Sequence, residues 1–237
     1  GSVVGHRLAT HPSVDVVVFT GSAATARSLA RLTHTRPELP VVLQCGGKGT
    51  ALVFSDADVD RAVYEVMVGA FLTAGQRHNS TGRVIVTDAV YEAFLPRLVQ
   101  QTRNLHVGYG FEPGVFMGPL ISENLRTRFR RFSRKLSGMG HSALLASEPP
   151  TGTGRGFYVR PSIIGMNWED HNPVLDAEPP GPTLLVYRVS DWQEAVALHN
   201  QVDARIATSV FTDPDSPAML DVKQRLRTGA LNINRGT

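Results

Sequence analysis

The chain has 237 residues, which is enough to bury a substantial core as one large domain or two small ones. Hydrophobic residues make up 42% of the sequence and charged residues 19%, a balance that excludes a disordered or fibrous protein. The formal net charge of +3 is small and dispersed, so no nucleic-acid partner is predicted. No apolar run approaches the ~20 residues that span a bilayer, so no membrane partner is predicted either.

Strand-like and helix-like segments alternate from residue 14 onward. Runs of β-branched and aromatic residues predict strands, and apolar residues at helical spacing predict helices. In the first half, strands are expected at 14–20, 41–43, 51–54 and 83–86, and helices at 23–32, 59–72 and 89–104. Ser22 is expected to cap the helix that follows it, and Asp56 and Asp58 precede the helix at 59–72.

The second half continues the alternation. Helices are expected at 120–139, 191–200 and 217–227, and strands at 143–145, 158–164, 183–189, 206–211 and 230–233. The pattern predicts an α/β fold with an open, mostly parallel twisted sheet flanked by helices. No GxGxxG fingerprint occurs, so a complete dinucleotide-binding unit of the usual kind is not expected.

The helix expected at 120–139 carries a dense run of basic residues interleaved with two phenylalanines. The run consists of Arg126, Arg128, Phe129, Arg130, Arg131, Phe132, Arg134 and Lys135. The cations recur around an amphipathic helix, so a solvated helix face is the favoured interpretation. A contact surface for an acidic protein partner stays the alternative.

The single cysteine, Cys45, cannot form an internal disulfide, and no cluster of cysteine and histidine has the spacing of a zinc site. A metal site is therefore not expected. The N-terminus lacks the layout of a signal peptide. These features together favour a cytoplasmic protein.

Several short motifs occur in an order that is typical of one family. They are His11-Pro12 with Val14-Asp15, Phe19-Thr20-Gly21-Ser22, Gly46-Gly47-Lys48, Asp56-Ala57-Asp58, Thr73-Ala74-Gly75-Gln76-Arg77, Met117-Gly118-Pro119-Leu120-Ile121-Ser122, and Glu178 with Gly181-Pro182. Each motif alone is weak, but their order and spacing together are specific. By these motifs the chain resembles the aldehyde dehydrogenase superfamily over nearly its whole length, and most closely the succinylglutamate semialdehyde dehydrogenases.

The resemblance implies a division of the chain. Residues 1–40 are expected to be the remnant of the last unit of a cofactor-binding domain. Residues 41–237 are expected to be the catalytic domain without the family's C-terminal segment, and the adenosine-binding strands would precede residue 1. No cofactor is accordingly expected for this chain by itself, whereas binding of NAD(P) by a longer parent protein stays open.

The resemblance also implies that both catalytic positions are substituted. The family oxidises aldehydes through a cysteine thiolate, and His78 stands at that position here. The family's general base is a glutamate, and Gln44 takes its place. An imidazole nitrogen would form a different adduct, and an amide does not accept a proton near neutral pH.

Replacement groups lie close to both positions. Cys45 follows Gln44, but in an extended segment the two side chains point in opposite directions, so a buried structural cysteine is favoured. Ser80 lies two positions after His78, and a serine nucleophile would need a base that the sequence does not identify. The remaining histidines are expected in loops or on helix surfaces, apart from His11 in its motif.

Three residues match cofactor contacts of the family. Gly21 and Ser22 match positions that approach the nicotinamide and a phosphate, and Glu178 matches the residue that holds the nicotinamide ribose. Pro180 replaces an aromatic residue that frames this ribose in the family. The favoured interpretation of Gly21 and Ser22 is a tight strand-to-helix turn, so the three residues are expected to form a vestigial cofactor site.

Three functions follow from these observations. The favoured one is a pseudoenzyme, an inactive aldehyde dehydrogenase-like domain that binds a protein or a small molecule. The alternative is an active NAD(P)-dependent semialdehyde or aldehyde dehydrogenase whose N-terminal cofactor domain is outside this chain. The third is an interaction domain that uses the arginine-rich helix. The expected partner is another protein or a second copy of the chain.

Overall fold

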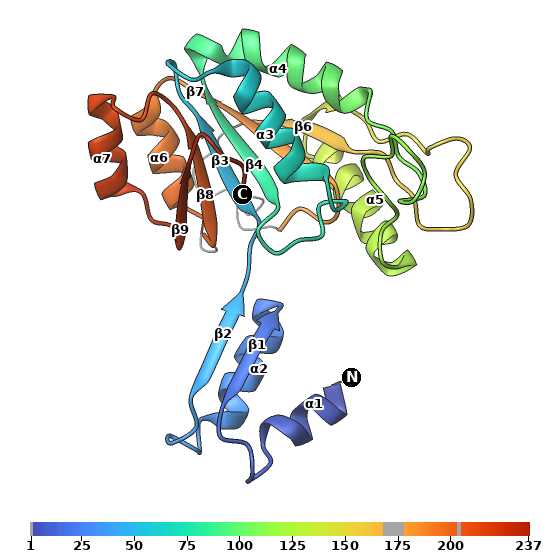
Figure 1. The fold of residues 1–237 in the computed structure, drawn as a ribbon, viewed down its shortest axis with the longest axis vertical. Helices are drawn as coiled ribbons and strands as arrows, with labels where there is room; N and C mark the ends of the chain where they lie inside the picture. Colours follow the sequence, from blue (N-terminus) through green and yellow to red (C-terminus); the bar gives the residue numbers. More distant parts are fainter. Residues whose placement is uncertain (1, 168–177, 203–204) are drawn as a thin grey trace. The chain divides into compact units, whose positions relative to one another are not determined.

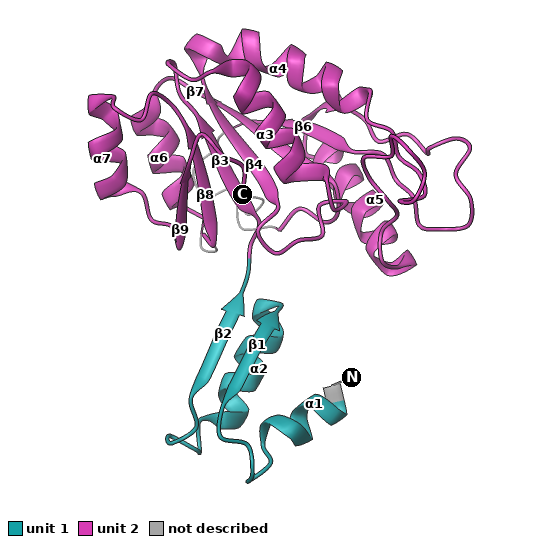
Figure 2. Ribbon diagram, viewed as in Figure 1, with its two compact units in different colours: residues 1–46 teal, residues 47–237 magenta. Residues whose placement is uncertain are grey.

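The computed structural model describes residues 2–167, 178–202 and 205–237. The chain divides into two compact units, residues 1–46 and residues 47–237, which are called unit 1 and unit 2 (Figure 2). The assignment of residues 1–40 to a cofactor-binding domain and of residues 41–237 to a catalytic domain stays a prediction.

Unit 1 contains two parallel strands and two helices. Its elements are α1 (Ser2–Ala9), β1 (Val17–Gly21), α2 (Ala23–Thr33) and β2 (Val41–Cys45), and β1 pairs with β2 in parallel. The predicted cap of α2 is confirmed, because Ser22 Oγ accepts a hydrogen bond from the backbone N–H of Thr25 at 3.2 Å. Helix α1 was not expected from the sequence, since its eight residues include the weak helix former Gly5.

Unit 2 is built on a seven-stranded sheet (Figure 1). Its elements are β3 (Gly49–Val53), α3 (Val59–Phe71), β4 (Thr81–Thr87), α4 (Asp88–Arg103), α5 (Glu123–Gly138), β5 (Ser142–Leu145), β6 (Ser162–Met166), β7 (Thr183–Val189), α6 (Trp192–Asn200), β8 (Ala207–Phe211), α7 (Pro217–Arg225) and β9 (Ala230–Ile233). The strand order is β5-β6-β7-β4-β3-β8-β9, and among these described strands only the β5–β6 pair is antiparallel. The predicted α/β fold with a mostly parallel sheet is therefore confirmed.

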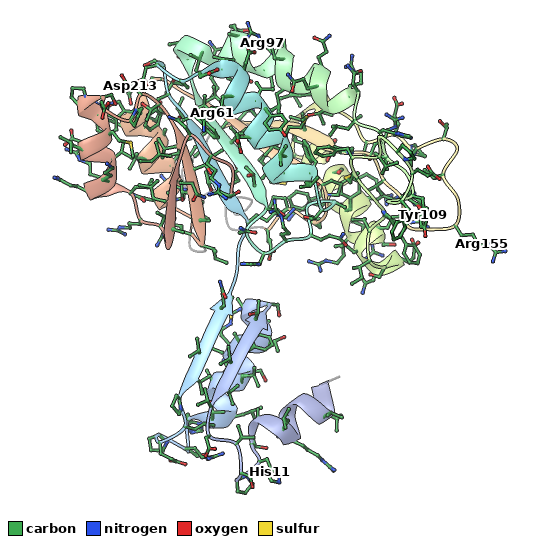
Figure 3. The ribbon with its side chains drawn as sticks, viewed as in Figure 1. His11, Arg61, Arg97, Tyr109, Arg155 and Asp213 are labelled. Carbon is green, nitrogen blue, oxygen red and sulfur yellow. The ribbon has the colours of Figure 1, made fainter. Side chains whose placement is uncertain are left out.

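Successive residues of the central strands face two separate cores. Ala51 and Val84 pack with α3 and α4 on one face of the sheet. Leu52 and Ile85, their neighbours in sequence, pack with α6 and α7 on the other face. Both faces are covered, so β3, β4 and β8 are buried at every position, including the polar residues Thr50, Arg83 and Thr208. Arg97 of α4, labelled in Figure 3, forms an ion pair with Asp60 of α3, with 2.5 Å between Nη1 and Oδ1, which joins the two helices at the surface.

Helix α5 begins three residues later than the predicted position. Ser122 Oγ accepts from the backbone N–H of Leu125 at 3.2 Å and so caps the helix. Leu120 lies outside the helix because its N–H donates to the carbonyl of Phe157 at 3.1 Å in an isolated antiparallel bridge. Strand β6 likewise begins later than predicted, directly after Pro161, which has no N–H for a ladder.

The arginine-rich helix α5 is amphipathic, as predicted. Phe129 and Leu136 are buried, whereas Arg128, Arg131 and Lys135 are exposed. Among the helices in the described ranges, none combines the length and the apolar character needed to cross a bilayer.

Candidate active site

Three of the motif segments lie at the amino ends of three neighbouring strands of unit 2. Residues 46–48 precede β3, residues 72–80 precede β4, and residues 178–182 precede β7. In the sheet these strands are adjacent, in the order β7-β4-β3, and they run parallel. Because parallel neighbours begin at the same edge, segments up to 133 positions apart in the sequence come into contact there.

At the opposite edge of the sheet, hydrogen bonds join the segment after β3 to the segment after β8. Asp56 follows β3, and its carboxylate accepts from Thr212 Oγ1 at 2.7 Å and from the N–H of Asp213 at 3.1 Å. Asp213 is labelled in Figure 3. The side-chain amide of Asn234 accepts from the N–H of Thr212 and donates to its carbonyl. Ligands of open α/β sheets usually bind beyond the carboxyl ends of the strands. In unit 2 three of the motif segments, residues 46–48, 72–80 and 178–182, gather at the amino ends instead.

The segment 72–80 is a tight loop with an internal hydrogen-bond frame. Ala74 and Gly75 have φ values of 53° and 61°. The N–H of Ser80 donates to the carbonyl of Arg77 at 3.1 Å, and the carbonyl of Ser80 accepts from the N–H of Gly49 at 2.8 Å. Gln76 Oε1 accepts from the N–H of Ile121 at 2.9 Å, so this loop is also fixed to the segment before α5.

His78 lies in this loop with an exposed side chain. Its imidazole is accessible to solvent. Ser80, the alternative nucleophile, is fully buried, and its Oγ has no hydrogen-bond partner among the residues that the structure describes. A serine that is shielded from substrate and lacks an adjacent base does not meet the requirements of nucleophilic catalysis.

Glu178 begins the segment before β7 and is exposed. The segment then turns sharply at Gly181, which has a φ of 60°. Thr183 holds the turn, since its N–H donates to the Gly181 carbonyl at 2.9 Å and its Oγ1 donates to the Pro180 carbonyl at 3.0 Å. The fixed turn is followed directly by β7, so it presents the Glu178 carboxylate at the amino edge of the sheet.

Lys48 connects the segment before β3 with this turn. The lysine is 3% exposed, and Nζ donates to the Gly181 carbonyl oxygen at 2.5 Å. Burial lowers the pKa of Lys48 to about 7, while the Glu178 carboxylate raises it and the Arg83 guanidinium lowers it further. The sequence identified Lys48 only as part of a motif and assigned it no role.

Gln44 and Cys45 belong to unit 1, whereas His78 belongs to unit 2. Strand β2 is extended over Val41–Cys45, so the side chains of Gln44 and Cys45 point to opposite faces, as predicted. Gln44 is exposed and Cys45 is half-buried. The roles of Gln44 and His78 as the base and nucleophile positions stay predictions from the resemblance.

The residues matched to cofactor contacts fit NAD(P) chemically within each unit. Gly21 and Ser22 are exposed at the junction of β1 and α2, and the first turn of α2 contains no acidic residue. An uncovered helix N-terminus of this kind favours an anion such as a phosphate. In unit 2 the exposed carboxylate of Glu178 can accept hydrogen bonds from ribose hydroxyls.

His199 was expected on a surface, and that expectation was wrong. The residue is 1% exposed, and its Nε2 lies 3.1 Å from the Arg227 carbonyl and 3.2 Å from Thr208 Oγ1. Burial lowers the pKa of His199 to about 4. The apolar stripe of α6, which includes Ala195 and Leu198, was a signal in the sequence that could have predicted this burial.

Comparisons with a family model, with curated proteins and with solved structures all match the chain to dehydrogenases that act on aldehydes. The model of the aldehyde dehydrogenase family matches residues 1–237. A chloroplastic betaine aldehyde dehydrogenase of Beta vulgaris is 33% identical over 234 residues, covering 99% of this chain and 46% of the relative. The alpha-ketoglutaric semialdehyde dehydrogenase of Bacillus subtilis (strain 168) is 32% identical over 237 residues, covering 99% of this chain and 48% of the relative.

Among solved structures, the NADP-dependent glyceraldehyde-3-phosphate dehydrogenase of Bacillus halodurans C-125, complexed with NADP, superposes with a TM-score of 0.86 at 30% identity. The superposition covers 100% of this chain and 48% of that one. The chain thus spans about half the length of these three proteins.

These matches correct the expectation of a pseudoenzyme. The relatives are named as aldehyde dehydrogenases, which are enzymes, and they match this chain from end to end. Inactivity had been inferred only from the side chains at Gln44 and His78, and an imidazole can still transfer a proton or act as a nucleophile. The inference that the chain is inactive was therefore wrong. Over its whole length, the chain belongs to the aldehyde dehydrogenase family.

Proposed function

We propose that this chain is part of an NAD(P)-dependent aldehyde dehydrogenase. The observation that carries the proposal is the family match over every residue from 1 to 237. Because the chain spans about half the length of its relatives, the proposal includes further cofactor-binding segments in a longer protein. Residues 1–40 would complete the cofactor domain, and residues 41–237 would form the catalytic domain.

The proposed cofactor contacts follow from the chemistry of the exposed groups. The backbone N–H groups at the start of α2, beside Gly21 and Ser22, would hold a phosphate of NAD(P). The Glu178 carboxylate would accept hydrogen bonds from a ribose. When bound, NAD(P) accepts a hydride from the substrate.

His78 is the proposed group for proton transfer at the substrate. Its side chain is exposed on the loop before β4, and an imidazole can both accept and donate a proton. Gln44 keeps an amide that can donate and accept hydrogen bonds, so it can orient a carbonyl or a water without taking its proton. In this proposal the imidazole would take a proton from a water molecule as the water oxygen adds to the aldehyde carbonyl, so the hydrate would stand in place of the family's sulfur adduct.

The proposed substrate class is an aldehyde. The relatives include proteins named for betaine aldehyde, for aminoaldehydes and for alpha-ketoglutaric semialdehyde. The alternative function inferred from the sequence motifs acts on a semialdehyde or another aldehyde, so the compounds tested are a semialdehyde, betaine aldehyde and an aminoaldehyde.

The test is formation of NADH or NADPH by the complete protein with each of these aldehydes. Calorimetric titration with NAD and NADP measures cofactor binding separately. The His78→Cys/Gln44→Glu double variant is the positive control, because it restores the family's nucleophile and base. Turnover by the native protein supports the proposal. If the native protein neither binds cofactor nor turns over any aldehyde while the double variant does both, the proposal is refuted.

A cytoplasmic location and a partner, either another protein or a second copy of the chain, also remain proposals. Relatives with chloroplastic and peroxisomal names show that location differs among similar proteins. Cell fractionation and light scattering of the complete protein test the two points.

A further inference from the structure

Lys48 extends across the amino edge of the unit 2 sheet. It directly precedes β3, and its Nζ reaches the carbonyl of Gly181 before β7 at 2.5 Å. On the way its aliphatic stem lies against Gly82 of β4, where an added β-carbon would be 2.6 Å from the Cβ of Lys48. The lack of a side chain at Gly82 leaves the space through which the lysine reaches Gly181.

The loop that carries His78 meets the same turn. A β-carbon on Gly75 would lie 2.2 Å from the carbonyl oxygen of Gly181, so the two backbones are in direct contact. The oxygen that accepts from Lys48 therefore also abuts the loop 72–80. Two segments, one carrying His78 and one carrying Glu178, are held against each other at this point.

Charge complementarity explains why a lysine suits this position. Glu178 lies three residues before Gly181, and its carboxylate stabilises the ammonium of Lys48. The guanidinium of Arg83 on β4 destabilises the same ammonium. Within the described part of the chain, Glu178 and Arg83 are the charged groups that act on Lys48. Burying an ammonium is unfavourable, so an apolar side chain would serve stability alone better than lysine does.

We propose that Lys48 is a positioning residue, which fixes the turn 178–182 through Gly181 and thereby holds the Glu178 carboxylate in place for the cofactor beside the loop of His78. The proposal rests on the proposed function because it takes NAD(P) as the cofactor. The contact between Lys48 and Gly181 does not depend on that function. Preorganisation of this kind reduces the ordering that binding would otherwise require.

The test compares Lys48→Met with the control Lys223→Met in the complete protein. Methionine keeps the length of the buried stem but removes the donor and the charge, and Lys223 is an exposed lysine on α7. Calorimetry measures the Kd for NAD(P) at pH 6 and pH 8, and hydrogen exchange reports on residues 73–78 and 178–183.

A hydrogen bond to a charged group contributes about 1.5–3 kcal/mol, so Lys48→Met should weaken cofactor binding at pH 6 roughly 10- to 100-fold. The wild-type affinity should fall between pH 6 and pH 8, because the ammonium loses its proton in this range, and Lys48→Met should abolish this pH dependence. A residue with a structural role alone would change the melting temperature without changing the pH profile. The backbone amides of residues 73–78 and 178–183 should exchange faster in Lys48→Met than in the wild type. In Lys223→Met their exchange should be unchanged.

Equal cofactor affinity, pH profile and exchange in Lys48→Met and wild type would overturn the proposal. If the wild type binds no NAD(P), the proposed function fails, while the exchange of the two segments still decides whether Lys48 positions them. Should Lys48→Met not fold, Lys48→Gln takes its place, since it keeps a neutral donor, and a pH-dependent cofactor affinity in that variant would also contradict the proposal.

Discussion

A β-carbon placed on Gly75 would lie 2.2 Å from the carbonyl oxygen of Gly181, which is far inside van der Waals contact. Gly75 also has a φ of 61°, a conformation that L side chains rarely adopt. The neighbour is a backbone oxygen held by Lys48 and Thr183, so it cannot move aside cheaply.

Gly75→Ala should therefore lower the free energy of unfolding by about 2–3 kcal/mol, the combined cost of steric overlap and backbone strain. Urea denaturation measures the change. Gly110→Ala is the matched control, because an added β-carbon there meets no atom within 4 Å, and Gly110 neighbours the exposed Tyr109 (Figure 3). Equal stability of the two variants would show that the contact with Gly181 is not tight.

The stability of the chain should rise with pH above neutrality because of Lys48. Its pKa is 10.5 as a free side chain and about 7 in the fold. Between these values the unfolded chain binds the additional proton, so the free energy of unfolding increases with pH by up to ~1.4 kcal/mol per pH unit. Below pH 7 both states hold the proton, and this contribution is constant. Lys48→Met should flatten the dependence from pH 7 to 10, and Lys223→Met should not. An unchanged slope in Lys48→Met would contradict the assignment.

His199 should make the fold sensitive to acid. Its pKa falls from 6.5 to about 4 on folding, because burial disfavours the imidazolium. The stability that it contributes is fully present above pH 6.5 and is lost as the pH falls toward 4, since only the unfolded chain then binds the proton. Acid titration followed by circular dichroism measures the effect. His199→Gln should reduce the loss in this window relative to the exposed-site control His106→Gln.

His78 should contribute to turnover and not to stability. Its side chain is exposed, so His78→Ala should leave the free energy of unfolding within about 0.5 kcal/mol of the wild-type value. Loss of a proton-transfer group lowers kcat by about 100- to 10,000-fold. An assay of NADH or NADPH formation with the complete protein measures kcat, and His106→Ala serves as a control for loss of an exposed imidazole. Equal kcat values for His78→Ala and wild type would remove His78 from the mechanism.

Local signals in the sequence predicted most elements and the character of the sheet. Ser22 and Asp58 accept from backbone N–H groups in the first turns of α2 and α3, and such caps depend on neighbouring residues alone. The start of α5 was placed too early because Leu120 instead pairs with Phe157, a contact that helix periodicity cannot reveal.

Motif order in the sequence also identified the family, because short segments such as 73–77 and 117–122 keep their residue types and spacing. It could not decide activity from Gln44 and His78, since a side-chain identity at one position does not exclude a different chemical role there. The family comparison overturned that inference.

By itself, then, the sequence determined the alternating elements, the parallel sheet and the family. Only the tertiary structure placed the segments before β3, β4 and β7 at one edge, buried His199, and brought Lys48 to the carbonyl of Gly181 across 133 positions. Secondary structure follows from periodicity and capping within a few residues, whereas strand order and the burial of a charge depend on contacts between residues far apart in the chain.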